Sequence, residues 1–251
     1  AVKLIDEGNT IPFIARYRKE ATGSLNDEQL RQLFERLTYL RNLEEKKEQV
    51  LSSIEEQGKL TQELREQILA ATIAKEKGLE PLAALITLQK TTVPVEETAK
   101  AYLSEEKEVK TVQDAIAGAK DIIAEYISDE ADYRIYIRNL TMKEGKILSA
   151  AKDAEESSVY EMYYAFEEPV QKVAGHRILA LNRGGKEKFL NVKIEAPDDK
   201  ILSYLEKKVI HAENPSTTPL LKEAVEDSYK RLIAPAIERE IRNDLTEKAE
   251  D

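Results

Sequence analysis

The chain has 251 residues, of which 41% are hydrophobic and 34% charged, and its formal net charge is −10. Because it contains no cysteine, disulfides, thiolate metal sites and cysteine nucleophiles are excluded. A free-standing nucleic-acid binder is usually basic, since neutralising phosphates supplies much of its affinity, so the chain as a whole does not fit that class. No apolar run approaches the roughly 20 residues of a membrane span, and the N-terminus shows no signal peptide. We therefore expect a soluble, cytoplasmic protein without a membrane partner.

The residue usage favours helices. Only 9 Gly and 8 Pro are present, too few for the turns of a sandwich or barrel, and strong helix formers dominate. We expect an all-α, multihelical fold with long hairpin-like elements, helical subdomains and at most one or two short strands. The expected domains are residues 1–91, which contain a long helix, and residues 92–251, which contain a short strand near 188–195 and a long C-terminal helix.

Start and stop signals locate the helices of the first part. Pro12 sits where a short helix begins. Asn26 with Gln29 has the spacing of a capping box and begins a long helix that Gly58 ends. Thr61 is expected to cap a shorter helix that runs to about residue 71.

A possible helix-turn-helix follows this shorter helix. Ala74, Gly78 and Ala84 fall near the spacing of that motif, and Pro81 fits only the first turn of its second helix. The alternative interpretation is a tight turn between two packed helices.

Further caps organise the second part. Thr111 with Asp114 begins one helix, Ser128 is expected to cap another, and Thr141 with Glu144 resembles a further capping box. Residues 174–183 are expected to form a helix that the Gly184-Gly185 pair ends. Pro235 is expected to kink or divide the final helix.

An aromatic cluster is expected on one short helix in this part. Such a cluster can stack nucleic-acid bases, but aromatic residues at helical spacing more often belong to a core. The members are Tyr160, Tyr163, Tyr164 and Phe166.

Charge is distributed unevenly. Residues 92–170 hold 9 basic and 18 acidic side chains, whereas residues 171–193 hold 6 basic and 1 acidic. An anion-binding surface is therefore expected to include the second stretch. Two alternatives stay open: residues 171–193 neutralise the acidic stretch, and Arg16 and Arg18 form internal salt bridges. The candidate nucleic-acid contacts are Arg16, Arg18, Lys19, Lys172, Arg177, Arg183, Lys186 and Lys188.

No constellation of residues predicts an active site. The acidic pair Asp198-Asp199 lies where a helix begins, and the helix dipole favours carboxylates there. His176 and His211 share no ligand-like spacing, and the Gly184-Gly185 pair is more typical of a cap than of a phosphate cradle. We expect no cofactor, no metal and no enzyme activity. The alternative is a nuclease or nucleotide hydrolase that works through clustered carboxylates and a metal.

One stretch carries a family resemblance. Residues 8–20, GNTIPFIARYRKE, strongly resemble the N-terminal region of the Tex family, the bacterial transcription accessory proteins. The likeness continues through residues 22–25, 54–60, 78–82, 114–119 and 175–180 and covers essentially the whole chain.

The resemblance implies an N-terminal helical module that scaffolds without catalysing. Family members continue with an RNase H-like domain, helix-hairpin-helix elements and an OB-fold RNA-binding domain. RNA or DNA binding is therefore expected mainly through domains beyond this chain, with the transcription or translation machinery as a further partner.

The chain departs from the family pattern at two points. A basic segment containing Leu-Pro-Tyr usually precedes the motif at residues 78–82. Here residues 70–74 run straight through, so that segment is either deleted or left out of the recorded sequence. If it was left out, the helix-turn-helix spacing is an artefact of the junction. Gly175 also stands where a serine is common in the family.

Overall fold

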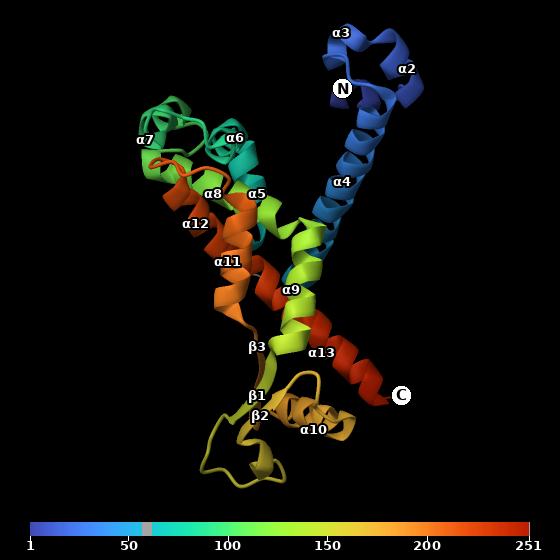
Figure 1. Cartoon of the computed structure of the whole chain (residues 1–251), viewed down its shortest axis with the longest axis vertical. Helices are drawn as coiled ribbons and strands as arrows, with labels where there is room; N and C mark the ends of the chain where they lie inside the picture. The colour runs from blue at the N-terminus through green and yellow to red at the C-terminus, as the bar shows by residue number, and fades with distance from the viewer. Residues whose placement is uncertain (57–61, 251) are drawn as a thin grey trace. The chain divides into compact units, whose positions relative to one another are not determined.

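A computed structural model describes residues 1–56 and 62–250, and the chain divides into two compact units, residues 1–69 and residues 70–251 (Figure 1). Most of the described residues are helical, which confirms the expected fold class. The division falls before the expected boundary at residue 91, because the helix at residues 80–88 packs on the helix at 112–128 of the second unit. Of the described helices, none is long and apolar enough to cross a membrane.

Short helices and one long helix form unit 1. They are α1 (Val2–Asp6), α2 (Ile11–Tyr17), α3 (Lys19–Thr22) and α4 (Asp27–Glu56). Pro12 lies in the first turn of α2, and Gly23 ends α3 in the left-handed conformation with φ of 68°. Helix α2 packs against α4 and buries Ile14, while Leu30 is buried on α4.

The expected capping box begins α4. The Gln29 backbone N–H donates to Asn26 Oδ1 at 2.8 Å, and the Asn26 N–H donates to Gln29 Oε1 at 3.0 Å. The expected end of this helix at Gly58 and the expected cap at Thr61 lie outside the described residues.

Helices also make up the first part of unit 2. Helix α5 (Gln62–Glu76), which begins in unit 1 and ends in unit 2, leads into α6 (Glu80–Leu88), α7 (Val95–Ala99), a 3-10 turn (Lys100–Tyr102), α8 (Val112–Ser128) and α9 (Ala131–Glu144). Thr111 and Asp114 form a complete capping box at the start of α8. Ser128 does not cap α9, because it is the last residue of α8 and its buried hydroxyl donates to the Glu125 carbonyl.

A small antiparallel sheet follows α9 and interrupts the helical chain. Its strands are β1 (Lys146–Ala151), β2 (Ala165–Pro169) and β3 (Leu190–Glu195) in the order β2-β1-β3. The predicted strand near residues 188–195 is β3, but three strands form where at most two were expected. Thr141 and Glu144 lie in the last turn of α9, so the helix start expected there is wrong.

Helix α10 (Gly175–Lys186) packs beside this sheet against β3 (Figure 1). It continues through Gly184 and Gly185, so the expectation that these glycines end the helix is wrong. Their physical role is space: a Cβ on Gly184 would lie 2.5 Å from Leu190 Cδ1 and 3.1 Å from the Tyr160 ring. Glycine at this position therefore lets the helix approach the sheet closely.

The two edges of the sheet differ. At the outer edge of β3, the Ile194 N–H donates to Glu238 Oε1 at 3.1 Å, and Arg242 donates to the Val192 carbonyl at 3.2 Å. At the other edge, the alternation of the antiparallel ladder turns the backbone groups of Ala165 and Glu167 outward. Side chains from a later helix thus cover one edge only.

The last part of unit 2 is again helical. Helix α11 (Asp198–Val209) is followed by α12 (Thr218–Asp227), a π-helical segment (Ser228–Ile233) and α13 (Ala234–Glu250). The irregularity expected at Pro235 is this π-helical segment just before it, because proline has no N–H to donate back along the helix. Ser228 donates to the Ala124 carbonyl at 2.6 Å, and Tyr229 donates to Asp198 at 2.6 Å. These bonds fix the segment to α8 and α11.

Candidate nucleic-acid interface

The predicted contact residues fall in both units. Arg16 lies on α2, Arg18 separates α2 from α3, and Lys19 begins α3, all in unit 1. The remaining five lie on or beside α10 in unit 2. The structure therefore provides two separate sets of cations, and each set has its own surroundings.

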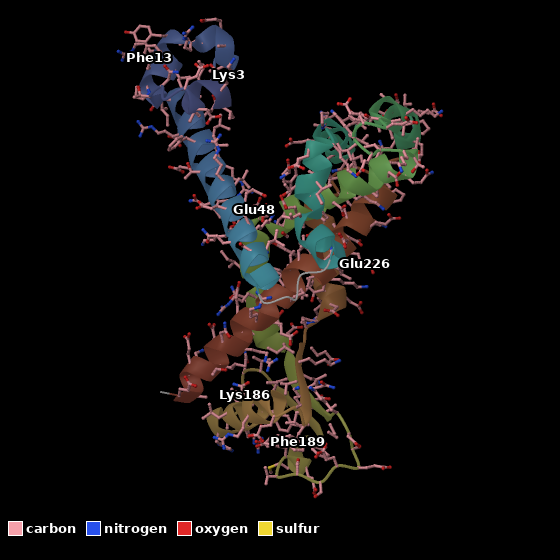
Figure 2. All side chains as sticks on the ribbon, turned by 180° about the vertical axis from the view of Figure 1, so that it is seen from behind. Lys3, Phe13, Glu48, Lys186, Phe189 and Glu226 are labelled. Carbon is pink, nitrogen blue, oxygen red and sulfur yellow. The ribbon has the colours of Figure 1, made fainter. Side chains whose placement is uncertain are left out.

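The set in unit 1 is exposed and carries aromatic neighbours. Arg16, Arg18 and Lys19 are all exposed, and none forms an ion pair with another residue of the described part. The internal salt bridges considered for Arg16 and Arg18 are therefore not seen there. Phe13, labelled in Figure 2, is on the same helix as Arg16. Phe13 and Tyr17 are 40% and 61% exposed, with ring centroids 5.3 Å apart. Sequence reasoning named the cations of this surface but not its two exposed rings.

Arg177 is tied into unit 2. Its guanidinium donates to Glu168 Oε2 at 2.8 Å and lies 5.9 Å from the centre of the Phe166 ring. Because Glu168 belongs to the acidic stretch, this pairing is the neutralising role considered for residues 171–193. Arg177 therefore joins α10 to β2 and is a poor candidate for a phosphate contact.

Lys172, Arg183 and Lys188 are also exposed, but each lies on a different local element. Lys172 follows β2 in a turn, Arg183 lies on α10, and Lys188 follows α10 with a φ of 69°. None of the three forms an ion pair with the described part of the chain. They remain candidate contacts, but they do not line a common pocket in the described part of the chain.

Lys186 lies at the C-terminal end of α10 (Figure 2). It also lines a groove. This groove, of about 560 Å³, runs between α10 and α13 and is named here the α10–α13 groove. Its lining combines three cations, two carboxamides and one carboxylate with small residues: Asn182, Gly185, Lys186, Pro235, Glu238, Arg239, Arg242, Asn243 and Thr246.

The electrostatics of this groove favour an anion. Glu238 is the single carboxylate of the lining and accepts the Ile194 N–H, so backbone contact partly satisfies it. Lys186 and Arg239 are exposed and form no ion pair within the described residues. Arg242 is partly held by its bond to the Val192 carbonyl. The Asn182 amide already donates to Thr246 Oγ1 at 2.8 Å. Lys186 and Arg239, on two packed helices, suit phosphate oxygens.

The aromatic cluster expected near these residues belongs to the core. Tyr160 and Tyr163 are buried at 5% and 6% exposure, and Tyr164 shares a hydrogen bond of 2.8 Å with Ser158. The core interpretation is therefore confirmed. The expected short helix is wrong, because these residues form a 3-10 turn (Glu161–Tyr163) and then β2.

Two family models match this chain. The model described as Tex-like protein N-terminal domain matches residues 1–55, and the model described as Tex central region-like matches residues 89–251. The chain belongs to the Tex family. The second match alone covers more than half of the sequence, so the membership expected from residues 8–20 is confirmed.

Named relatives of this Tex chain come from bacteria and from humans. The uncharacterized protein YdcI of Bacillus subtilis is 49% identical over the whole chain, which spans 38% of YdcI. Transcriptional accessory protein Tex of Neisseria gonorrhoeae is 41% identical over 79% of the chain and 29% of that protein. The human S1 RNA-binding domain-containing protein 1 is 29% identical over 99% of the chain and 28% of that protein. The chain thus spans well under half of each relative.

The departure near residue 74 falls between the two Tex matches. Residues 56–88 belong to neither matched range, and the alignment with YdcI runs over 274 residues, longer than this chain. YdcI therefore carries residues that this chain lacks. In the structure α5 continues through residues 70–74 to Glu76, and Gly78, with φ of 76°, turns the chain into α6.

The α5–α6 turn has the connection of a helix-turn-helix but not its chemistry. Helix α6 buries Leu82, Ala83 and Ile86, and Glu80 is its single charged residue. A recognition helix needs side chains that reach base edges, most often arginine or lysine. The structure therefore favours the tight turn between packed helices.

Sequence reasoning missed the half of the α10–α13 groove that comes from α13. Its members follow the spacing of one helix face at residues 235, 238, 239, 242, 243 and 246. Acidic residues of α13, most of them outside the groove lining, hide its two arginines in a count of net charge. A face-by-face reading of this Tex helix would have found them.

Proposed function

We propose that this chain is the N-terminal helical module of a Tex-like transcription accessory protein of the cytoplasm. It orients nucleic-acid-binding domains of a longer protein, offers surfaces to the transcription or translation machinery, and binds RNA or DNA weakly by itself. The names of the Neisseria and human relatives support a role connected with transcription and RNA. The module has no catalytic step of its own.

The observation that carries the binding part of this proposal is the α10–α13 groove. It places Lys186 and Arg239 on two packed helices without ion-pair partners among the described residues. A polyanion satisfies both cations at once and releases its counterions, which makes the binding sensitive to salt. The overall charge of −10 opposes long-range attraction, and for this reason the binding is weak.

Acidic side chains support the non-catalytic part. In residues 1–56 and 62–250, no group of three or more His, Cys, Asp or Glu side chains is placed to hold a metal ion. The Asp198 carboxylate accepts a hydrogen bond from Tyr229 at the start of α11, which is a structural role. A metal-dependent nuclease needs two or three carboxylates that meet around a cation.

A salt series tests the binding site. The double variant Lys186→Gln, Arg239→Gln is compared with wild type by fluorescence anisotropy, using a labelled single-stranded RNA and a DNA duplex. Each phosphate contact that is lost lowers the log–log salt slope by about one. We expect the double variant to lose most of its affinity and to have the flatter slope.

A matched control removes the same charge elsewhere. Lys90 and Lys110 are exposed and form no ion pair with the described residues, so Lys90→Gln, Lys110→Gln changes the net charge equally. If both double variants lose the same affinity for RNA and DNA, the loss is an effect of net charge and the groove is not the binding site. Hydrolysis of the RNA or of ATP with magnesium, lost on changing a carboxylate, would replace the proposal with the enzyme alternative.

A further inference from the structure

The β1–β2 connection exposes two large apolar side chains. Val159 is 86% exposed and Met162 is 74% exposed, the highest values for large hydrophobic residues in the described part of the chain. Residues 152–164, which connect β1 to β2, are named here the β1–β2 loop. We propose that this loop is a docking site for a basic protein surface that offers an apolar depression ringed by lysine or arginine.

Buried tyrosines hold the loop in place. The Tyr160 hydroxyl donates to Glu187 Oε2 at 2.8 Å, and its ring lies 5.7 Å from that of Phe189. The Tyr163 ring lies 5.3 Å from that of Phe166 in an edge-on arrangement. The absence of a side chain on Gly184 leaves room for the Tyr160 ring against α10. The base of the loop is thus part of the core.

Val159 and Met162 alternate with these anchors and face solvent. Val159 directly precedes Tyr160, and Met162 directly precedes Tyr163. Because the tyrosines are fixed inward by packing and hydrogen bonds, the exposure of their neighbours is a property of a folded turn. The chain therefore presents two apolar groups, three residues apart, on an ordered support.

Four carboxylates lie close in sequence to the two apolar groups. Asp153, Glu155, Glu156 and Glu161 are all exposed, while Lys152 is the single cation of residues 152–164. None of the first three carboxylates forms an ion pair with the described residues, and Glu161 accepts a hydrogen bond from Ser157 at 2.6 Å. The loop thus combines two exposed apolar side chains, called here its apolar centre, with four exposed carboxylates close to them in sequence, called here its acidic rim.

This combination selects one class of occupant. Nucleic acids and anionic lipid surfaces are repelled by the acidic rim. Protein–protein interfaces combine an apolar core with a polar rim, and the loop offers both kinds of side chain. Opposite charge on the partner speeds encounter, and burial of the valine and methionine side chains supplies the affinity. The site is independent of the α10–α13 groove, whose charge has the opposite sign.

A model peptide serves as the probe. A labelled amphipathic helical peptide of leucine and lysine is titrated with the whole chain, beside a leucine–glutamate peptide and a serine–lysine peptide. The leucine–lysine peptide should bind wild type best, because it alone matches both the apolar centre and the acidic rim. For Val159→Ser, Met162→Gln we expect binding that is weaker by about tenfold or more.

Two matched controls isolate the loop. Leu88→Gln, Val93→Ser removes exposed apolar groups elsewhere, and both residues are at least 47% exposed. Glu105→Gln, Glu106→Gln removes two exposed carboxylates elsewhere, for comparison with Glu155→Gln, Glu156→Gln in the loop. We expect about a threefold loss and a smaller salt dependence from the loop carboxylates, and changes of less than about twofold from both controls.

Three results would overturn the proposal. One is equal binding of the leucine–lysine peptide to the Val159→Ser, Met162→Gln variant and to its control. Another is equally tight binding of the leucine–glutamate peptide. The third is self-association of wild type by sedimentation equilibrium that the same variant abolishes, since this would assign the loop to a second copy of the chain. Circular dichroism confirms that each variant is folded.

Discussion

The two units stabilise their helices in different ways. In unit 1, Ile14, Leu30, Leu51 and Leu69 are the buried apolar side chains among the residues whose burial is described. In unit 2 one continuous cluster runs from Ala74 to Leu245. Caps and ion pairs such as Asn26 with Gln29 and Arg41 with Asp6 are the described local contacts of unit 1. In unit 2, burial is the larger source of stability. The same kind of substitution should have different consequences in the two units.

The largest expected effect comes from a cavity in unit 2. Ile122 is fully buried on α8, which packs against α6, α7 and α12. We expect Ile122→Ala to lower the unfolding free energy of unit 2 by about 2–5 kcal/mol, measured by urea denaturation. The matched change Leu30→Ala should disorder unit 1 and leave the unit 2 transition in place. A single transition that both variants shift equally would mean that the units unfold together.

A smaller effect separates two caps of the same design. Thr111→Ala removes the capping box of α8 and should lower the unfolding free energy of unit 2 by about 0.5–2 kcal/mol. Asn26→Ala removes the capping box of α4 and should raise hydrogen exchange only near the start of that helix. Urea denaturation measures the first effect, and hydrogen exchange measures the second. If Asn26→Ala lowered protection from hydrogen exchange throughout unit 2, the two units would not be independent.

The smallest expected effect is a pH dependence in unit 2. Burial, and then the hydrogen bond to Asp198, raise the pKa of Tyr229 above its ordinary 10.0. Because the folded state favours the neutral phenol, this stabilisation is complete below about pH 10 and is lost as the pH rises further. Tyr229→Phe should therefore cost about 1 kcal/mol at neutral pH and flatten the alkaline decrease in unfolding free energy. An unchanged alkaline slope would assign that decrease to other groups.

Local signals predicted much of the fold. The capping boxes at Asn26 and Thr111 satisfy backbone groups within one turn, so sequence alone was sufficient to find them. Strand β3 shows alternation, but β2, with the sequence AFEEP, has little strand propensity and forms through pairing with β1. Gly184 continues a helix because its contacts come from Leu190 and Tyr160, which local sequence does not reveal.

Only the α10 side of the α10–α13 groove could be predicted from the sequence. Contiguous charge identified Lys186, but Arg239 reaches the same groove from a helix about fifty residues later. Arg177 shows the opposite case, since the same charge count included a side chain that is paired with Glu168. Net charge along the chain therefore locates a basic region but does not separate free cations from paired ones.

The unequal edges of the sheet bear on aggregation. An exposed strand edge can template a strand from another molecule, which leads to fibrous assembly. Here Glu238 accepts one N–H and Arg242 donates to one carbonyl at the edge of β3. The free edge of β2 is five residues long, carries Glu167 and ends in Pro169, which has no N–H to offer. A sheet of only three strands is thereby protected against growth in either direction.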